Sequence, residues 1–322
     1  MASKKSLRAC GFALSRSVPH QCFMSVAFCA LALSFGIPDS LQAQANSSAS
    51  NEPREAVADR PNINITPKRL TFGRGERTIT AYVFNQGDSP ATFDISLVDR
   101  AMLPNGEIEA VSELKKDPKL APLLARAKTA SDLLLVTPRR ATLSPGKGQT
   151  IRIRLKSPPP AESELRTHLT VTTIPPRSLG LTADEAAAAS QGNNLNFQIA
   201  SIFGISVPVI VRTGTPEIAG RISGVQLRRI TVANGRQVPA LSFELERTGS
   251  NSLYGNISVV GKNSKATYAT VRGVGVYPEI DARRIEIPLQ REPQPGETLD
   301  VKFVDDDLTP GRTIAESSYV VG

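Results

Sequence analysis

The stretch that decides the fold is "LNFQIASIFGISVPVIV", residues 195–211. Its odd-numbered positions are apolar except Ser201, and its even-numbered positions begin with the polar Asn196 and Gln198. This alternation has the period of two that characterises a β-strand, but the run is far longer than the five or six residues of an ordinary strand. It also contains Pro208, which cannot donate to a sheet ladder and belongs on an edge strand or at a bulge. The stretch therefore predicts a long apolar edge strand, a feature that invites aggregation.

Residues 1–45 have the parts of a secretory signal. An apolar core, 23–35, follows a start that carries four basic residues, and "LQAQA" (41–45) ends in the small-x-small pattern of a cleavage site. We expect cleavage after Ala45 and export of the remaining chain. The core is shorter than the roughly 20 residues of a transmembrane helix, although an uncleaved anchor stays an alternative.

Cysteine content and charge narrow the possible classes of protein. Cys10, Cys22 and Cys29 all lie in the leader, so the exported chain has to be stabilised by its core without disulfides. Cys29 leaves a lipoprotein open, but the preceding "VAF" lacks the usual small residue. The formal net charge is +8, part of it from the leader, and aromatic residues are only 5% of the chain with no Trp. This composition argues against a nucleic-acid-binding protein.

Short β runs separated by turns occupy the chain from Ile63 onward. Strands at this spacing without alternating helices predict an all-β protein built from antiparallel sandwiches. Two segments interrupt the pattern: 112–135, where we expect a short helical insertion, and 182–192, where a capping box predicts another short helix. A hinge is expected at 212–220. The expected parts are a signal peptide (1–45), a disordered lead-in (46–60), an N-terminal domain (61–213) and a C-terminal domain (214–322).

No catalytic constellation can be assembled after the leader. His168 is the only histidine there, on a predicted strand, and no G-x-S-x-G motif accompanies it. "SPGKGQT" (144–150) lacks the spacing of a phosphate loop and is typical of a hairpin turn. "DDD" (305–307) lacks the spacing of a calcium loop, which favours a solvated or salt-bridged turn. We expect no enzyme activity, no metal and no other cofactor.

A series of motifs behind the leader carries a family resemblance: "ITPKRLTF", "TITAYVFNQGDSPATFDISL", "TPRRATLSPGKGQTIRIRL", "ELRTHLTVTTIPPRS" and "ISVPVIVR". The series resembles the PapD-like periplasmic chaperones of the chaperone–usher pilus pathway, well over 63–213 and more loosely over 214–322. The resemblance implies two immunoglobulin-like β-sandwich domains in a boomerang arrangement. It also implies a periplasmic chaperone that binds pilin or fimbrial subunits by donating an edge strand, delivers them to an outer-membrane usher, and uses no ATP.

Carried over position by position, the resemblance implies three sets of site residues. Arg69 would grip the C-terminal carboxylate of the subunit, since a guanidinium binds a carboxylate bidentately; the alternative is a solvated edge arginine. The family's second cleft cation falls near Pro208, where no lysine occurs, and Lys68 or Arg212 could substitute. The donated strand comprises Leu195, Phe197, Ile199, Ser201 and Phe203, and an interdomain salt bridge comprises Glu164, Arg212 and Asp306, unless these three are unrelated surface charges.

The alternative to a chaperone is a structural or adhesive two-domain β-sandwich protein on the cell surface. A covered edge at 195–207 would favour that alternative, because a donated strand has to be accessible.

Overall fold

The computed structural model of the chain describes residues 62–161, 164–175 and 202–322. These described residues belong to one compact unit. The predicted leader, the lead-in 46–60 and the predicted helix 182–192 lie outside the described residues, as do Leu195, Phe197, Ile199 and Ser201. The described residues form an all-β fold, as the strand pattern predicted.

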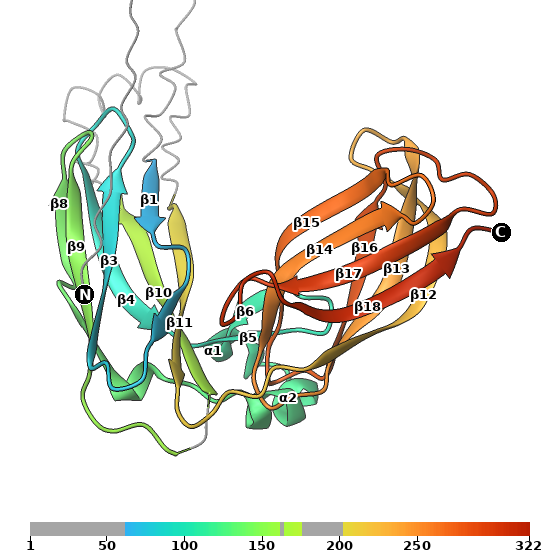
Figure 1. Cartoon of the computed structure of the whole chain (residues 1–322). Coiled ribbons are helices and arrows are strands. Elements are labelled where there is room, and N and C mark those ends of the chain that lie inside the picture. The colour runs from blue at the N-terminus through green and yellow to red at the C-terminus, as the bar shows by residue number, and fades with distance from the viewer. Residues whose placement is uncertain (1–61, 162–163, 176–201) are drawn as a thin grey trace, which may run out of the picture. The chain divides into compact units, whose positions relative to one another are not determined.

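The first of two sandwiches is built from residues 63–212 (Figure 1). One sheet has the order β1-β3-β9-β7, with bounds Ile63–Thr66, Thr78–Asn85, Gly148–Leu155 and Leu134–Thr137. The other has the order β2-β11-β10-β4-β8, with bounds Leu70–Phe72, Gly204–Arg212, Glu164–Ile174, Ala91–Val98 and Arg140–Leu143. Alternate apolar side chains of both sheets form one core, which includes Ile65, Val83, Phe93, Ile151, Leu169 and Val209.

The second sandwich follows the predicted hinge and begins at Gly220. Its smaller sheet has the order β12-β13-β16, with bounds Gly220–Thr231, Gln237–Arg247 and Ala282–Pro288. Its larger sheet has the order β15-β14-β17-β18, with bounds Thr267–Val276, Leu253–Gly261, Thr298–Asp305 and Thr313–Val320. The two sheets enclose a separate core that includes Leu241, Phe243, Ile257, Val301 and Phe303. Both sandwiches are immunoglobulin-like in strand order.

The "SPGKGQT" segment forms a turn, but the prediction of a hairpin is wrong. Strand β8 before the turn pairs with β4, whereas β9 after it pairs with β3 and β7 in the opposite sheet. The turn therefore carries the chain from one layer of the sandwich to the other. Gly146 has a φ of 68°, a left-handed conformation that glycine adopts without steric cost.

The segment predicted as a short helical insertion, 112–135, contains most of helix α1 (Val111–Leu114), helix α2 (Ala121–Arg126) and the 3₁₀ turns η1 (Pro118–Leu120) and η2 (Ser131–Leu133). A hairpin of β5 (Arg100–Met102) and β6 (Ile108–Ala110) precedes it, so the insertion of the structure begins at Arg100. Met102 belongs to the core cluster of the second sandwich, and Leu123 packs against that cluster. The insertion thus joins the first sandwich to the core of the second. Among the described residues, no helix has the length and apolar character needed to cross a membrane.

A close backbone approach fixes the end of β17. Gly255 in β14 lies opposite Asp305, and a Cβ atom on Gly255 would lie 2.1 Å from the carbonyl oxygen of Val304. No real Cβ contact is that short, and the obstacle is backbone, which cannot rotate away. Only glycine therefore lets β14 hold the strand that leads into Asp305–Asp307.

We predict that Gly255→Ala lowers the free energy of unfolding by about 1–3 kcal/mol, because the added methyl group forces β14 and β17 apart. The matched control is Gly275→Ala in the neighbouring β15, where the nearest atom would lie at an ordinary 3.5 Å. Urea unfolding followed by circular dichroism measures both. Equal midpoints for the two variants would contradict the close approach.

Candidate functional site

Strand β10 carries a row of polar side chains on the face opposite the core. Leu165, Leu169 and other odd-numbered residues enter the first core, whereas Glu164, Arg166 and His168 project from the other face. All three are nevertheless buried, with 3–5% of each residue exposed. Buried charges are stable only when they are paired or neutralised, so the partners of this row define the site.

Glu164 and Arg212 lie opposite each other in the β10–β11 ladder and form an ion pair, with 2.7 Å between Arg212 Nε and Glu164 Oε2. Arg212 Nη2 also donates to Asp307 Oδ2 at 2.5 Å, which links the first sandwich to the turn after β17. Asn251 and the backbone N–H of Ser252 donate to Glu164. Burial acts to raise the pKa of Glu164, but Arg212 and these hydrogen bonds outweigh it, so the pKa is lowered and the carboxylate stays ionised.

The third member of this network is Asp307, so the prediction of Asp306 is wrong by one residue. The Asp306 residue is exposed, and its backbone N–H donates to the carbonyl of Tyr254. Asp305 is buried and accepts hydrogen bonds from Thr309, which fixes the turn. The turn thereby places Asp307, and not its neighbour, against Arg212.

Arg69 precedes β2 and also binds Asp307. Its Nη2 lies 3.0 Å from Asp307 Oδ2, and its Nη1 donates to the Tyr277 hydroxyl at 3.2 Å. The guanidinium carbon lies 4.3 Å from the ring centroid of Tyr254 and 5.9 Å from that of Tyr277, within cation–π range. Arg69 is therefore held in one orientation and is not a solvated edge arginine.

No second cation occupies the position of Pro208. Its partner across the ladder is His168, whose pKa is lowered to about 3 by burial and by the positive charges of Arg166, Arg100 and Arg69. His168 is therefore neutral at physiological pH. The two substitutes considered from the sequence are engaged elsewhere: Lys68 donates to Asn64, and Arg212 is bound to Glu164 and Asp307.

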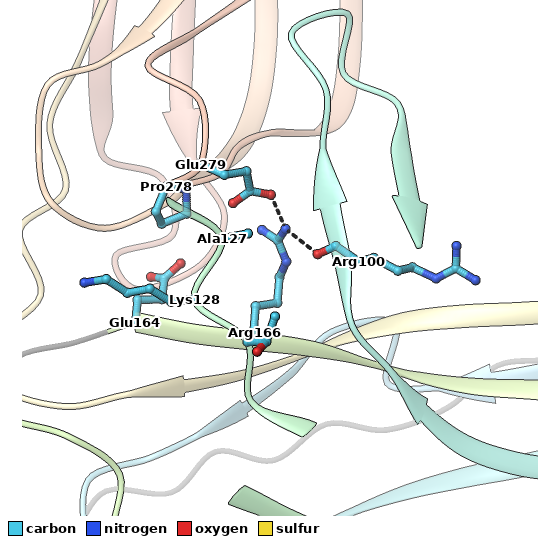
Figure 2. Close-up of a pocket in the computed structure, with 8 residues that line it drawn as sticks. Arg100, Ala127, Lys128, Glu164, Arg166, Pro278 and Glu279 are labelled. Carbon is cyan, nitrogen blue, oxygen red and sulfur yellow. Dashed lines mark hydrogen bonds and ion pairs between the residues drawn. The ribbon is translucent and has the colours of Figure 1, made fainter. Parts of the chain in front are cut away.

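Arg166 makes a second buried connection between the sandwiches, which the sequence did not predict (Figure 2). Its guanidinium points toward Glu279 and forms an ion pair with it, donates to the Arg100 carbonyl at 3.2 Å, and lies 3.6 Å from the Tyr277 ring centroid. Glu279 also accepts from the backbone N–H of Met102 at 2.6 Å. The pocket around this pair has room for about one water molecule. Charged residues alternating with apolar ones in "ELRTHL" are the signal that could have identified Arg166.

The insertion adds a third connection at its helical end. Arg126 in α2 forms an ion pair with Asp281 at 2.5 Å and donates to the carbonyl of Pro278. This pair is exposed, and exposed pairs contribute little to stability. The insertion is therefore held mainly by Met102 and Leu123 in the second core.

Strand β11 has one edge that is open among the described residues. On the side away from β10, its strand partner in that part of the chain is β2, which pairs with Val209, Ile210 and Val211. The Phe203 carbonyl accepts from the backbone N–H of Thr173, and the Phe203 N–H donates to the Thr173 hydroxyl. With Phe203 facing β10, the alternation of an antiparallel ladder directs the backbone groups of Gly204, Ser206 and Pro208 away from β10. Pro208 thus leaves no gap in the β10–β11 ladder. Within the described residues, no strand pairs with this edge over Gly204–Pro208.

The open edge carries apolar side chains. Odd-numbered residues of β11 enter the first core, where Val207 and Val209 are buried and Ile205 is partly buried. Phe203 continues this alternation with 38% of its surface exposed, and Ile202 on the other face is 65% exposed. In the same described ranges, no group of three or more His, Cys, Asp or Glu residues could hold a metal ion.

We predict that Asp307→Asn lowers the free energy of unfolding by about 3 kcal/mol, because it leaves buried Arg212 without its second carboxylate. The neighbouring change Asp306→Asn is the control and is expected to shift it by less than about 0.5 kcal/mol. Urea denaturation at neutral pH measures both. An equal loss in both variants would contradict the assignment of Asp307.

We predict that His168 makes the fold weaker in mild acid. The unfolded chain binds a proton near the ordinary histidine pKa, whereas folded His168 does so only near 3, so unfolding becomes easier as the pH falls from 7 to 5. The loss is about 2 kcal/mol over this interval. His168→Gln should flatten the pH dependence of the urea midpoint, since no other histidine follows residue 45. An unchanged slope in His168→Gln would contradict the prediction.

Comparison with known proteins gives one family match. Residues 119–212 match the family model described as "Pili and flagellar-assembly chaperone, PapD N-terminal domain". No curated protein sequence matches the chain.

Solved structures similar to the chain include proteins described as chaperones. The YadV chaperone is 11% identical with a TM-score of 0.41, and the match covers 80% of this chain and 99% of that one. The CupB2 chaperone of Pseudomonas aeruginosa is 14% identical with a TM-score of 0.40, covering 80% and 100%. The CsuC–CsuE complex of Acinetobacter baumannii is 10% identical with a TM-score of 0.41, covering 81% and 98%. The resemblance to PapD-like chaperones is thus confirmed by the family match over residues 119–212.

Proposed function

We propose that this chain is a periplasmic chaperone that binds pilin or fimbrial subunits by lending them the open edge of β11 and delivers them to an outer-membrane usher. The proposal depends mainly on this open edge, which lies in the segment that the chaperone family model matches. An unpaired, apolar strand edge is a liability unless another chain completes it. In this proposal the subunit supplies the missing pairing partner.

The strand would be recognised in two ways. The outward backbone groups of Gly204 and Ser206 give affinity that does not depend on sequence, and alternate side chains give specificity. Phe203 is the exposed member of the apolar face, and the same alternation assigns Leu195, Phe197 and Ile199 to it, with Ser201 as a weak point.

Arg69 is the proposed anchor for the terminal carboxylate of the subunit. It lies directly before Leu70, which pairs with Val209 of β11, so it is next to the start of the open edge. Tyr254 and Tyr277 already fix the orientation of its guanidinium. Because His168 is neutral and Pro208 replaces the expected cation, Arg69 acts here without a second anchor.

The proposed mode needs neither catalysis nor ATP, since pairing of the strand provides the free energy of capture. The chain would act as two domains, 61–213 and 214–322, after removal of residues 1–45 in the course of export. The Glu164–Arg212–Asp307 network and the Arg166–Glu279 pair would hold the domains in one arrangement.

We predict that Phe203→Glu reduces the amount of co-purifying subunit at least tenfold, because the charge would be buried in the subunit core without a partner. Ile202→Glu is the matched control, since Ile202 is the adjacent, more exposed residue on the opposite face. The assay is affinity purification of each variant from periplasm, with mass spectrometry of the captured proteins. Phe197→Glu and Gln198→Glu extend the same comparison along the strand.

Circular dichroism of each variant controls for folding. Equal capture by Phe203→Glu and Ile202→Glu would exclude donation through this face. Recovery of the wild-type protein from the cell surface without any fimbrial subunit would instead favour the structural or adhesive alternative.

A further inference from the structure

One carboxylate oxygen serves two arginines in this chain. Asp307 Oδ2 accepts from Arg212 at 2.5 Å and from Arg69 at 3.0 Å. The longer contact is also the more accessible one, because the Arg69 side chain is 11% exposed and that of Arg212 is 4% exposed. Of the two contacts to Asp307, the one with Arg69 is therefore the longer and the more accessible.

Arg69 would keep its orientation without Asp307. The ring of Tyr254 lies against the guanidinium, and the Tyr277 hydroxyl still accepts from Nη1. Arg69 Nε is buried and has no partner among the described residues. Loss of Asp307 would leave Nη2 beside this free Nε, and these two donors form the edge that binds a carboxylate bidentately.

Asp307 also would not become an unpaired buried charge on leaving Arg69, because it retains Arg212. The following Leu308 is 42% exposed, so Asp307 lies at the rim of the site. The turn itself is held by Asp305 through Thr309, independently of Arg69.

The donors of Arg69 favour exchange over addition. Asp307 already occupies Nη2, and the Tyr277 hydroxyl occupies Nη1. A ligand carboxylate that binds bidentately through Nε and Nη2 needs the donor that Asp307 holds. A carboxylate bound to Arg69 therefore competes with Asp307 for the same guanidinium.

We propose that Asp307 is an internal competitor that occupies Arg69 in the free protein and is displaced by the terminal carboxylate of the subunit. This inference rests on the proposed function. It makes Asp307 a residue that sets specificity: a carboxylate alone has to outcompete a tethered one, whereas a carboxylate on a strand that also pairs with β11 gains the additional backbone bonds. When the subunit carboxylate binds Arg69, the ion pair between Arg69 and Asp307, which links the two sandwiches, is released.

The test is binding of a fluorescent peptide that copies the C-terminal strand of the co-purifying subunit, made with a free terminal carboxylate and as the terminal amide. In Asp307→Asn we expect the affinity for the carboxylate form to rise about tenfold, as a charge-assisted competitor is removed. Affinity for the amide form should stay unchanged. Asp306→Asn should match the wild type for both peptides.

Three further variants separate the possible causes. Glu164→Gln weakens the same network but leaves the contact between Asp307 and Arg69. It should therefore not raise the affinity for the carboxylate peptide. An increase equal to that of Asp307→Asn would overturn the proposal. An unchanged or lower carboxylate affinity in Asp307→Asn, and in Asp307→Ser as a second replacement, would also overturn it while leaving Arg69 as the anchor. If Arg69→Ala binds both peptides as the wild type does, the anchor itself is wrong and the proposal fails with it.

Discussion

The structure depends on the pairing of buried arginines with carboxylates from distant parts of the chain. Removing an arginine from water is costly, and the cost is recovered only when a carboxylate and further hydrogen bonds meet it in good geometry. Arg212 meets Glu164 and Asp307, and Arg166 meets Glu279, with every side chain in these pairs less than 10% exposed. Buried ion pairs can therefore connect the two sandwiches, because each buried arginine lies against a carboxylate.

This arrangement explains why β11 can be regular along one side and open along the other. Its ladder with β10 is continuous from Gly204 to Arg212. At the C-terminal end of β11, Arg212 forms an ion pair with Glu164. Among the described residues, β2 covers the other edge over Val209–Val211. The strand is thus paired on both sides at its C-terminal end, whereas Gly204–Pro208 pair, within the described ranges, with β10 alone.

Local pattern predicted the strands and the helical segment within 112–135, because each is set by residues close together in sequence. The all-β class followed from period-two runs, and a family resemblance supplied Arg69, Glu164 and Arg212. Two kinds of feature could not be predicted. "DDD" offers three carboxylates, and only the path of the turn selects Asp307, which is a property of three-dimensional geometry. Glu279 has no local signal at all, since its partner Arg166 lies 113 residues earlier.

The position of Met102 has a consequence for the order in which the chain acquires its structure. Met102 and Leu123 belong to the sequence of the first sandwich, yet they complete the core of the second. A chain that emerges with its N-terminus first would expose these side chains before the strands of their core. The first sandwich contains all the strands of its own two sheets, whereas its insertion needs β13, β14 and β17 to bury Met102. The insertion therefore cannot complete its packing before the second core forms, and the same holds for the contact between Arg69 and Asp307.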